Sequence, residues 1–81
     1  MINEKEMDFV VYCVENLANY ISEDSVKVFD LLDENDLIEG YILKFYDILH
    51  TQSKEWIVED LVEQLEKRGV KIWFYIMVLL L

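Results

Sequence analysis

Cys13 and His50 are the only cysteine and histidine in this chain, so they are the first candidates for nucleophilic or metal chemistry. A cysteine nucleophile needs a base beside it, yet Cys13 lies within a largely apolar stretch, which indicates a small buried hydrophobic residue. Asp47 and His50 have the spacing of half a helical di-metal site. Such a site needs a second copy of this motif and two further inward carboxylates. We therefore predict no metal site.

An acidic turn at Asp33, Asn35 and Asp36 is the next candidate, because carboxylate and amide oxygens bind calcium. The calcium loop needs glycine at its sixth position, where this chain has Ile38. The sequence also has no glycine-rich phosphate loop and no specific pair of catalytic carboxylates. We expect no catalytic residue and no cofactor, and so expect that the chain is not an enzyme.

One tract combines aromatic, imidazole and amide side chains, Tyr46-Asp47-Ile48-Leu49-His50-Thr51-Gln52. Its structural interpretation is a helix end, with His50 near the negative end of the helix dipole and Thr51 as a cap. Its functional interpretation is a protein-binding surface made by Tyr46, His50 and Gln52. The residue types allow both.

The charge balance restricts the partner. Seventeen acidic residues against seven basic ones give a net charge of −10, which repels phosphate backbones and argues against direct nucleic-acid binding. A basic protein surface is a more natural partner, although the charge can also serve solubility alone. A lone cysteine forms no internal disulfide, and the polar N-terminus is not a secretory signal, so we expect a cytoplasmic protein.

The elements that must position these residues are helices. A chain of 81 residues is expected to form one compact domain. Apolar residues recur at helical spacing over about residues 4 to 21, with Phe9 and Cys13 widening the stripe, which consists of Met7, Val10, Val14, Leu17 and Ile21.

Three more helices are expected, with neighbours packed mostly antiparallel. Ser22 is the candidate cap of a second helix ending near Glu34, and Asp36 with Glu39 has the spacing of a capping box that starts a third, ending near His50. Thr51 or Ser53 can cap a fourth helix, which Gly69 closes in a left-handed conformation. Phe29, Phe45, Leu49, Ile57 and Leu61 are predicted to be buried together.

The fold class predicted is thus all-α, a compact four-helix domain over residues 1–69 with an apolar C-terminal segment over 70–81. Ten consecutive apolar residues, 72–81, are too few for a transmembrane helix. This tail can fold back as core, contact a second chain, lie at a membrane surface or be non-native. If it contacts a second chain, Trp73, Phe74 and Tyr75 form a second partner-binding patch and the chain can form homo-oligomers.

The tract at 46–52 resembles the signature Tyr-Asp-x-Leu-His-Thr-Gln of a family of short bacterial proteins, domain of unknown function 3791. The similarity extends over about residues 5 to 68 and includes three further segments, Phe-Val-Val-Tyr-Cys-Val-Glu, Val-Phe-Asp-Leu-Leu and Ile-Val-Glu-Asp. The apolar tail departs from the family pattern.

The resemblance implies a small partner of a protein encoded by a neighbouring gene, often a toxin similar to ADP-ribosyltransferases. Our leading hypothesis is therefore a non-catalytic interaction module with an antitoxin-like or accessory role. The alternative is a helical structural or regulatory subunit that assembles with itself through its apolar tail.

Overall fold

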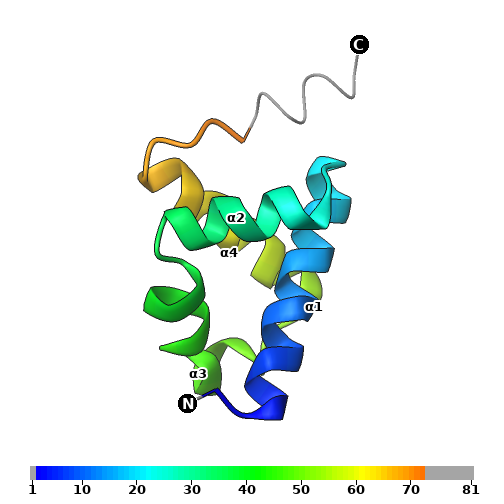
Figure 1. Cartoon of the computed structure of the whole chain (residues 1–81), viewed down its shortest axis with the longest axis vertical. Coiled ribbons are helices and arrows are strands. Elements are labelled where there is room, and N and C mark those ends of the chain that lie inside the picture. The colour runs from blue at the N-terminus through cyan, green and yellow to red at the C-terminus, as the bar shows by residue number, and fades with distance from the viewer. Residues whose placement is uncertain (1, 73–81) are drawn as a thin grey trace.

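The computed structural model describes residues 2–72 of the chain. Within this span all regular structure is helical, which confirms the predicted all-α class (Figure 1). The elements are α1 (Glu4–Ile21), α2 (Ser25–Glu34), the π-helix η1 (Ile38–Leu43), the single turn α3 (Tyr46–Leu49) and α4 (Lys54–Lys67).

Helix α1 starts with a capping box. The backbone N–H of Glu6 donates to Asn3 Oδ1 at 2.8 Å, and the backbone N–H of Asn3 donates to Glu6 Oε1 at 3.4 Å. Two free N–H groups at the helix start are thereby satisfied. The predicted apolar stripe is buried except for Met7, which lies at its edge in the first turns and is exposed.

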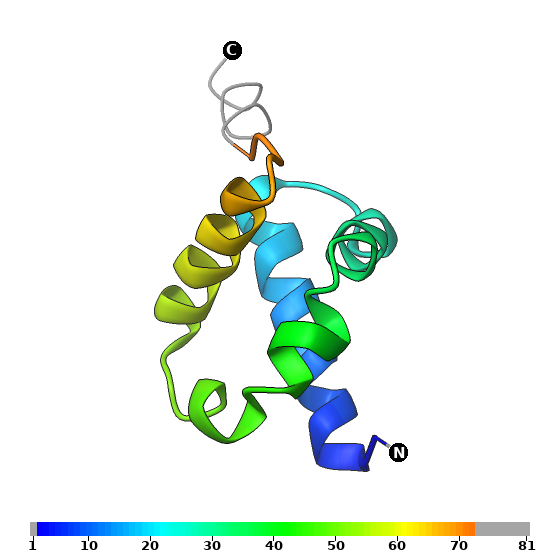
Figure 2. The same cartoon turned by 90° about the vertical axis from the view of Figure 1, so that its left-hand side faces the viewer.

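The link to α2 differs from the prediction. Ser22 is not the cap of α2, because it takes a left-handed conformation with φ 52° and ends α1. The cap is Asp24, whose Oδ1 accepts from the N–H of Val26 at 3.3 Å. The chain therefore turns before α2 begins, and α2 crosses the long axis of the domain instead of running antiparallel to α1 (Figures 1 and 2).

This crossing explains why the predicted burial of Phe29 is wrong. Helix α2 meets the core through Val28 and Leu32, one turn apart, and both are fully buried. Phe29 follows Val28 by about 100° around the helix axis, so it points away from the contact and is 41% exposed.

The predicted third helix is interrupted. Asp36 has φ 55° and caps nothing, while the N–H of Ile42 donates to Leu37 O five residues earlier at 2.9 Å, a π-helical bond. The wider turns change the angular register, and the backbone bends at Phe45 before α3. Phe45 consequently leaves the buried stripe and is 38% exposed, against the prediction, whereas Leu49 is buried as predicted.

Helix α4 follows the prediction closely. Ser53 caps it, because its Oγ accepts from the N–H of Trp56 at 3.2 Å. Gly69 takes φ 86°, and the N–H of Val70 then donates to Leu65 O at 3.0 Å, the six-to-one bond of a Schellman ending. This turn directs the chain back to the domain, where Ile72 is fully buried.

One apolar core joins all these elements. Among the described residues no polar or charged side chain is buried, so the core depends on apolar packing alone. Its members are Phe9, Val10, Cys13, Val14, Leu17, Ala18, Ile21, Val28, Leu32, Leu37, Ile38, Ile42, Leu49, Ile57, Val58, Leu61, Leu65 and Ile72.

The burial of Ile72 leads to a stability prediction. Ile72→Ala should lower the free energy of unfolding by about 2 to 5 kcal/mol, because it removes buried methyl groups and leaves a cavity. The matched control Ile48→Ala should change it by less than about 0.5 kcal/mol, since Ile48 is 61% exposed. Urea titrations followed by circular dichroism measure both values. Equal, small losses would show that Ile72 does not belong to the core.

Candidate partner-binding surface

The short turn α3 holds the predicted tract in a defined geometry. Leu49 is buried and anchors the turn to the core. His50 Nδ1–H donates to Tyr46 O at 2.7 Å, and Thr51 Oγ1 donates to Ile48 O at 2.7 Å. The same two carbonyls also accept from the backbone N–H groups of His50 and Thr51, so the backbone and the imidazole are fixed together.

Tyr46 and His50 form an exposed aromatic stack. Their ring centroids are 4.6 Å apart and their planes differ by 5°. Tyr46 is half-buried, because its other contact is edge-to-face with Phe9 of α1, at 5.4 Å and 83°. Phe9 in turn stacks with Tyr12 at 6.2 Å. We call these four side chains, Tyr12, Phe9, Tyr46 and His50, the aromatic row.

A hollow of about 220 Å³ adjoins Tyr46, between the start of α1 and the η1–α3 bend. The residues that line it include two acidic side chains and one lysine and are Asn3, Glu6, Leu43, Lys44, Tyr46 and Asp47. The capping box fixes Glu6 on one side. The surface beside the stack is therefore acceptor-rich and suits donors from a partner.

The structure brings together two of the six residues predicted to bind a partner, Tyr46 and His50. Gln52 lies after the end of α3 and is half-buried, and its backbone N–H donates to Leu49 O at 3.0 Å. Trp73, Phe74 and Tyr75 lie outside the described residues.

Sequence reasoning missed that Phe9 and Tyr12 belong to this surface. One signal was available, because residues three apart on a helix are neighbours and Phe9 and Tyr12 have that spacing. The contact of Phe9 with Tyr46 joins residues 37 positions apart and depends on how α3 docks on α1.

Comparison with protein families supplies one match. The family described as "Protein of unknown function (DUF3791)" matches residues 8–68. The chain belongs to this family. The match includes the whole aromatic row and Gln52, and it ends before Gly69. Searches of curated proteins and of solved structures found no match.

Within the residues that match the family, a side-chain hydrogen bond joins η1 to α4. Tyr41 Oη donates to Asp60 Oδ2, and Tyr41 also packs edge-to-face with Phe45 at 5.5 Å. Partial burial, followed by the hydrogen bond and the charge of Asp60, raises the pKa of the Tyr41 phenol well above its ordinary value. The bond therefore needs a neutral phenol, because only the protonated oxygen can donate.

The lone thiol of this family member lies in the core, not at the surface. Cys13 is fully buried, and burial raises its pKa to about 12, so it is neither a thiolate nor accessible. In the described span no three histidine, cysteine, aspartate or glutamate side chains gather to hold a metal ion. Over residues 2–72, no helix has both the length and the apolar character needed to cross a membrane.

The Tyr41–Asp60 bond predicts a pH-dependent stability. In the unfolded chain Tyr41 ionises near its ordinary pKa of about 10, whereas in the folded chain it stays protonated to higher pH. The stabilisation is therefore complete below about pH 10 and is lost as the pH rises towards the raised folded pKa. Tyr41→Phe should cost about 1 kcal/mol at neutral pH and should show a weaker alkaline loss than the unsubstituted protein.

Thermal unfolding of the two proteins between neutral and alkaline pH measures this difference. Other groups that ionise at high pH, including the Cys13 thiol, are present in both proteins and cancel in the comparison. Parallel pH profiles would mean that Tyr41 does not contribute to the alkaline transition.

Proposed function

We propose that this chain is a non-catalytic protein-interaction module, the antitoxin-like or accessory partner of an enzyme encoded beside it in a bacterial genome. The observation that carries the proposal is the stacked Tyr46–His50 pair, held by α3 and supported from below by Phe9. Rigid, half-exposed aromatic side chains are the usual centres of binding energy in protein interfaces, because little entropy is lost when a partner covers them.

The polar parts of this surface support a protein partner over other classes. Glu6 and Asp47 line the hollow beside Tyr46, so phosphates are repelled and basic or amide-rich surfaces are favoured. The net charge of −10 would also accelerate encounters with a basic protein. A toxin similar to ADP-ribosyltransferases is the partner that the family resemblance implies. We place the interaction in the cytoplasm, where the unpaired Cys13 stays reduced.

A second candidate function is self-assembly into a structural or regulatory subunit. The observation that favours it is the run of apolar residues that continues for nine positions after buried Ile72. Light scattering of the purified protein separates the two functions: a stable oligomer that dissociates when residues 73–81 are removed supports self-assembly, and a monomer supports the interaction module.

Substitutions in the aromatic row should weaken the complex with the neighbouring enzyme. His50→Ala and Tyr46→Ala each remove half of the stack, and Gln52→Ala removes the adjacent amide; we expect losses of about 1 to 4 kcal/mol of binding free energy. Helicity should change little, because none of the three is a fully buried core residue, although Tyr46 packs against the core from outside it. Calorimetry with the purified enzyme measures the affinities.

The control is Phe29→Ala, which removes an exposed aromatic side chain from α2 and should leave the affinity unchanged. If the control weakens the complex as strongly as His50→Ala, the interface lies elsewhere. If no complex forms, or if the isolated protein turns over a substrate, the proposed function is wrong.

The acidic face of α4 should act through the rate of association. Changing Glu55, Glu59 and Glu63 together to glutamine should slow binding to a basic partner and weaken its salt dependence, because exposed charges mainly steer the encounter. The same charge change on α2, with Asp30, Asp33 and Glu34 made into amides, should have a smaller effect. Stopped-flow association over a salt series measures both association rates. Equal slowing by the two sets would mean that the net charge of the protein matters and that its location on α4 does not.

A further inference from the structure

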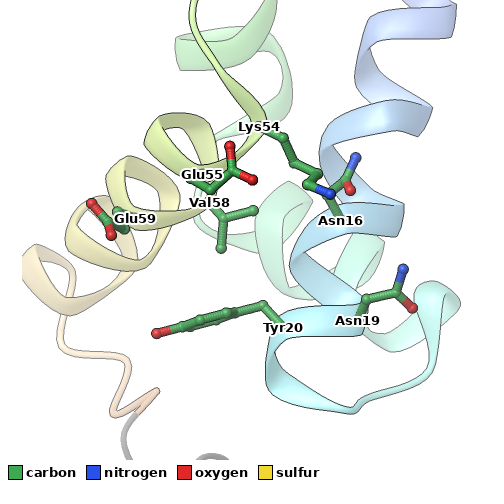
Figure 3. A pocket seen from close by; sticks show the side chains of 7 residues that line it. All are labelled: Asn16, Asn19, Tyr20, Lys54, Glu55, Val58 and Glu59. Atoms are coloured by element: carbon green, nitrogen blue, oxygen red, sulfur yellow. The ribbon is translucent and has the colours of Figure 1, made fainter.

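A second hollow, separate from the aromatic row, lies between α1 and α4 (Figure 3). Its volume is about 320 Å³, and the residues that line it are Asn16, Asn19, Tyr20, Lys54, Glu55, Val58 and Glu59. We call it the α1–α4 pocket.

The apolar part of the α1–α4 pocket consists of Val58 and the Tyr20 ring. Val58 is buried, whereas Tyr20 is 50% exposed and has no aromatic partner within residues 2–72. Figure 3 shows the Tyr20 ring extending from α1 towards the side of α4, past Val58. An exposed ring face beside an apolar residue suits a flat group that can stack on it.

The polar part of the pocket is rich in acceptors. Glu55 and Glu59 form no ion pair with any cation of the described chain, where the pairs are Lys27–Glu23 and Lys67–Glu63. Asn16 uses its Nδ2 to donate to Tyr12 O at 2.8 Å, so its Oδ1 is left to accept. Lys54 also lines the pocket and supplies one positive charge against the two carboxylates, and Figure 3 shows its side chain extending towards Asn16.

We propose that the α1–α4 pocket binds an arginine side chain of the protein partner. The guanidinium group would stack on Tyr20 and donate its N–H groups to the carboxylates of Glu55 and Glu59, while its methylene stem covers Val58. A lysine ammonium lacks the flat face and is more strongly hydrated, so it fits this pocket less well. Phosphate ligands are repelled by the two carboxylates.

The position of the pocket agrees with a single continuous interface. Tyr12, Asn16 and Tyr20 follow one another at four-residue intervals, so they lie along one side of α1, and Tyr12 belongs to the aromatic row. Eight residues of helix rise about 12 Å, a distance that one partner segment spans easily. The inference rests on the proposed function, because the arginine is taken to come from the same protein partner.

Nuclear magnetic resonance titration with a blocked alanine-arginine-alanine tripeptide tests the pocket without the partner. We expect saturable shifts of the amide signals of Tyr20, Glu55 and Glu59. The tripeptide with lysine should bind at least about threefold more weakly, because the stacking contribution of an exposed cation on an aromatic ring is modest. The tripeptide with uncharged citrulline should not produce saturable shifts.

Variants of the folded protein make the test specific. Tyr20→Ala should abolish the preference for arginine over lysine, and Glu59→Gln should weaken both peptides. Phe29→Ala removes another exposed aromatic side chain, outside the pocket, and should change neither. The inference would be overturned if the arginine and lysine peptides bind with equal strength, or if neither produces saturable shifts at the pocket. It would also be overturned if the pocket signals shift when the protein concentration alone is raised, because a second copy of the chain would then be the occupant.

The failure of this inference is distinguishable from failure of the proposed function. If the arginine peptide does not bind but the enzyme complex forms and depends on His50, only the pocket assignment is wrong. If the peptide binds with the expected preference but no enzyme complex forms, the arginine pocket stands and the proposed function is wrong.

Discussion

The burial of one side of α1 is the constraint on which the rest of this small domain depends. Helices α2, η1 and α4 all pack against α1, and its buried residues extend from Phe9 to Ile21. Because the described core contains no buried polar or charged side chain, its stability comes from apolar contact and shape alone. A chain of this size leaves little surplus over its conformational entropy, so each element must contribute apolar surface to this one helix.

The break in the third helix follows from the same constraint and creates the candidate surface. A straight helix would keep Ile42, Phe45 and Leu49 on one side, and it would carry Phe45 into the core. The π-helical turns of η1 and the bend at Phe45 release this side chain, and the next residue, Tyr46, meets Phe9 instead. π-Helical turns frequently occur at functional sites, where they redirect side chains, and this one places the Tyr46–His50 stack beside α1.

Several exposed aromatic and acidic side chains of α1 and α4 gather on one side of the two helices. The side of α1 next to α3 and α4 carries Tyr12, Asn16 and Tyr20, which join the aromatic row to the α1–α4 pocket. Helix α4 presents Glu55 and Glu59 beside this side, and within residues 2–72 neither carboxylate forms an ion pair. Exposed aromatic rings next to unpaired charges cost little in the free domain and become favourable when a basic, flat or amide-rich partner covers them.

The sequence by itself determined the fold class, the ends of α1 and α4, the left-handed turn at Gly69 and the burial of Cys13. These features depend on apolar spacing, on capping residues and on the left-handed conformation of glycine, all of which involve residues close together in the sequence. The sequence also marked Tyr46 and His50, because the tract is unusual in composition and resembles a family signature. It predicted N-cap roles for Ser22 and Asp36 and burial for Phe29 and Phe45, and these predictions were wrong. Local propensity favoured those positions, but the crossing of α2 and the π-helical register of η1 are set by packing against α1.

The placement of Phe9 beneath Tyr46, and of Tyr20 in one pocket with Glu55 and Glu59, came from the tertiary structure alone. These residues are more than thirty positions apart, and the spacing of residues along a chain predicts only contacts between near neighbours in the sequence.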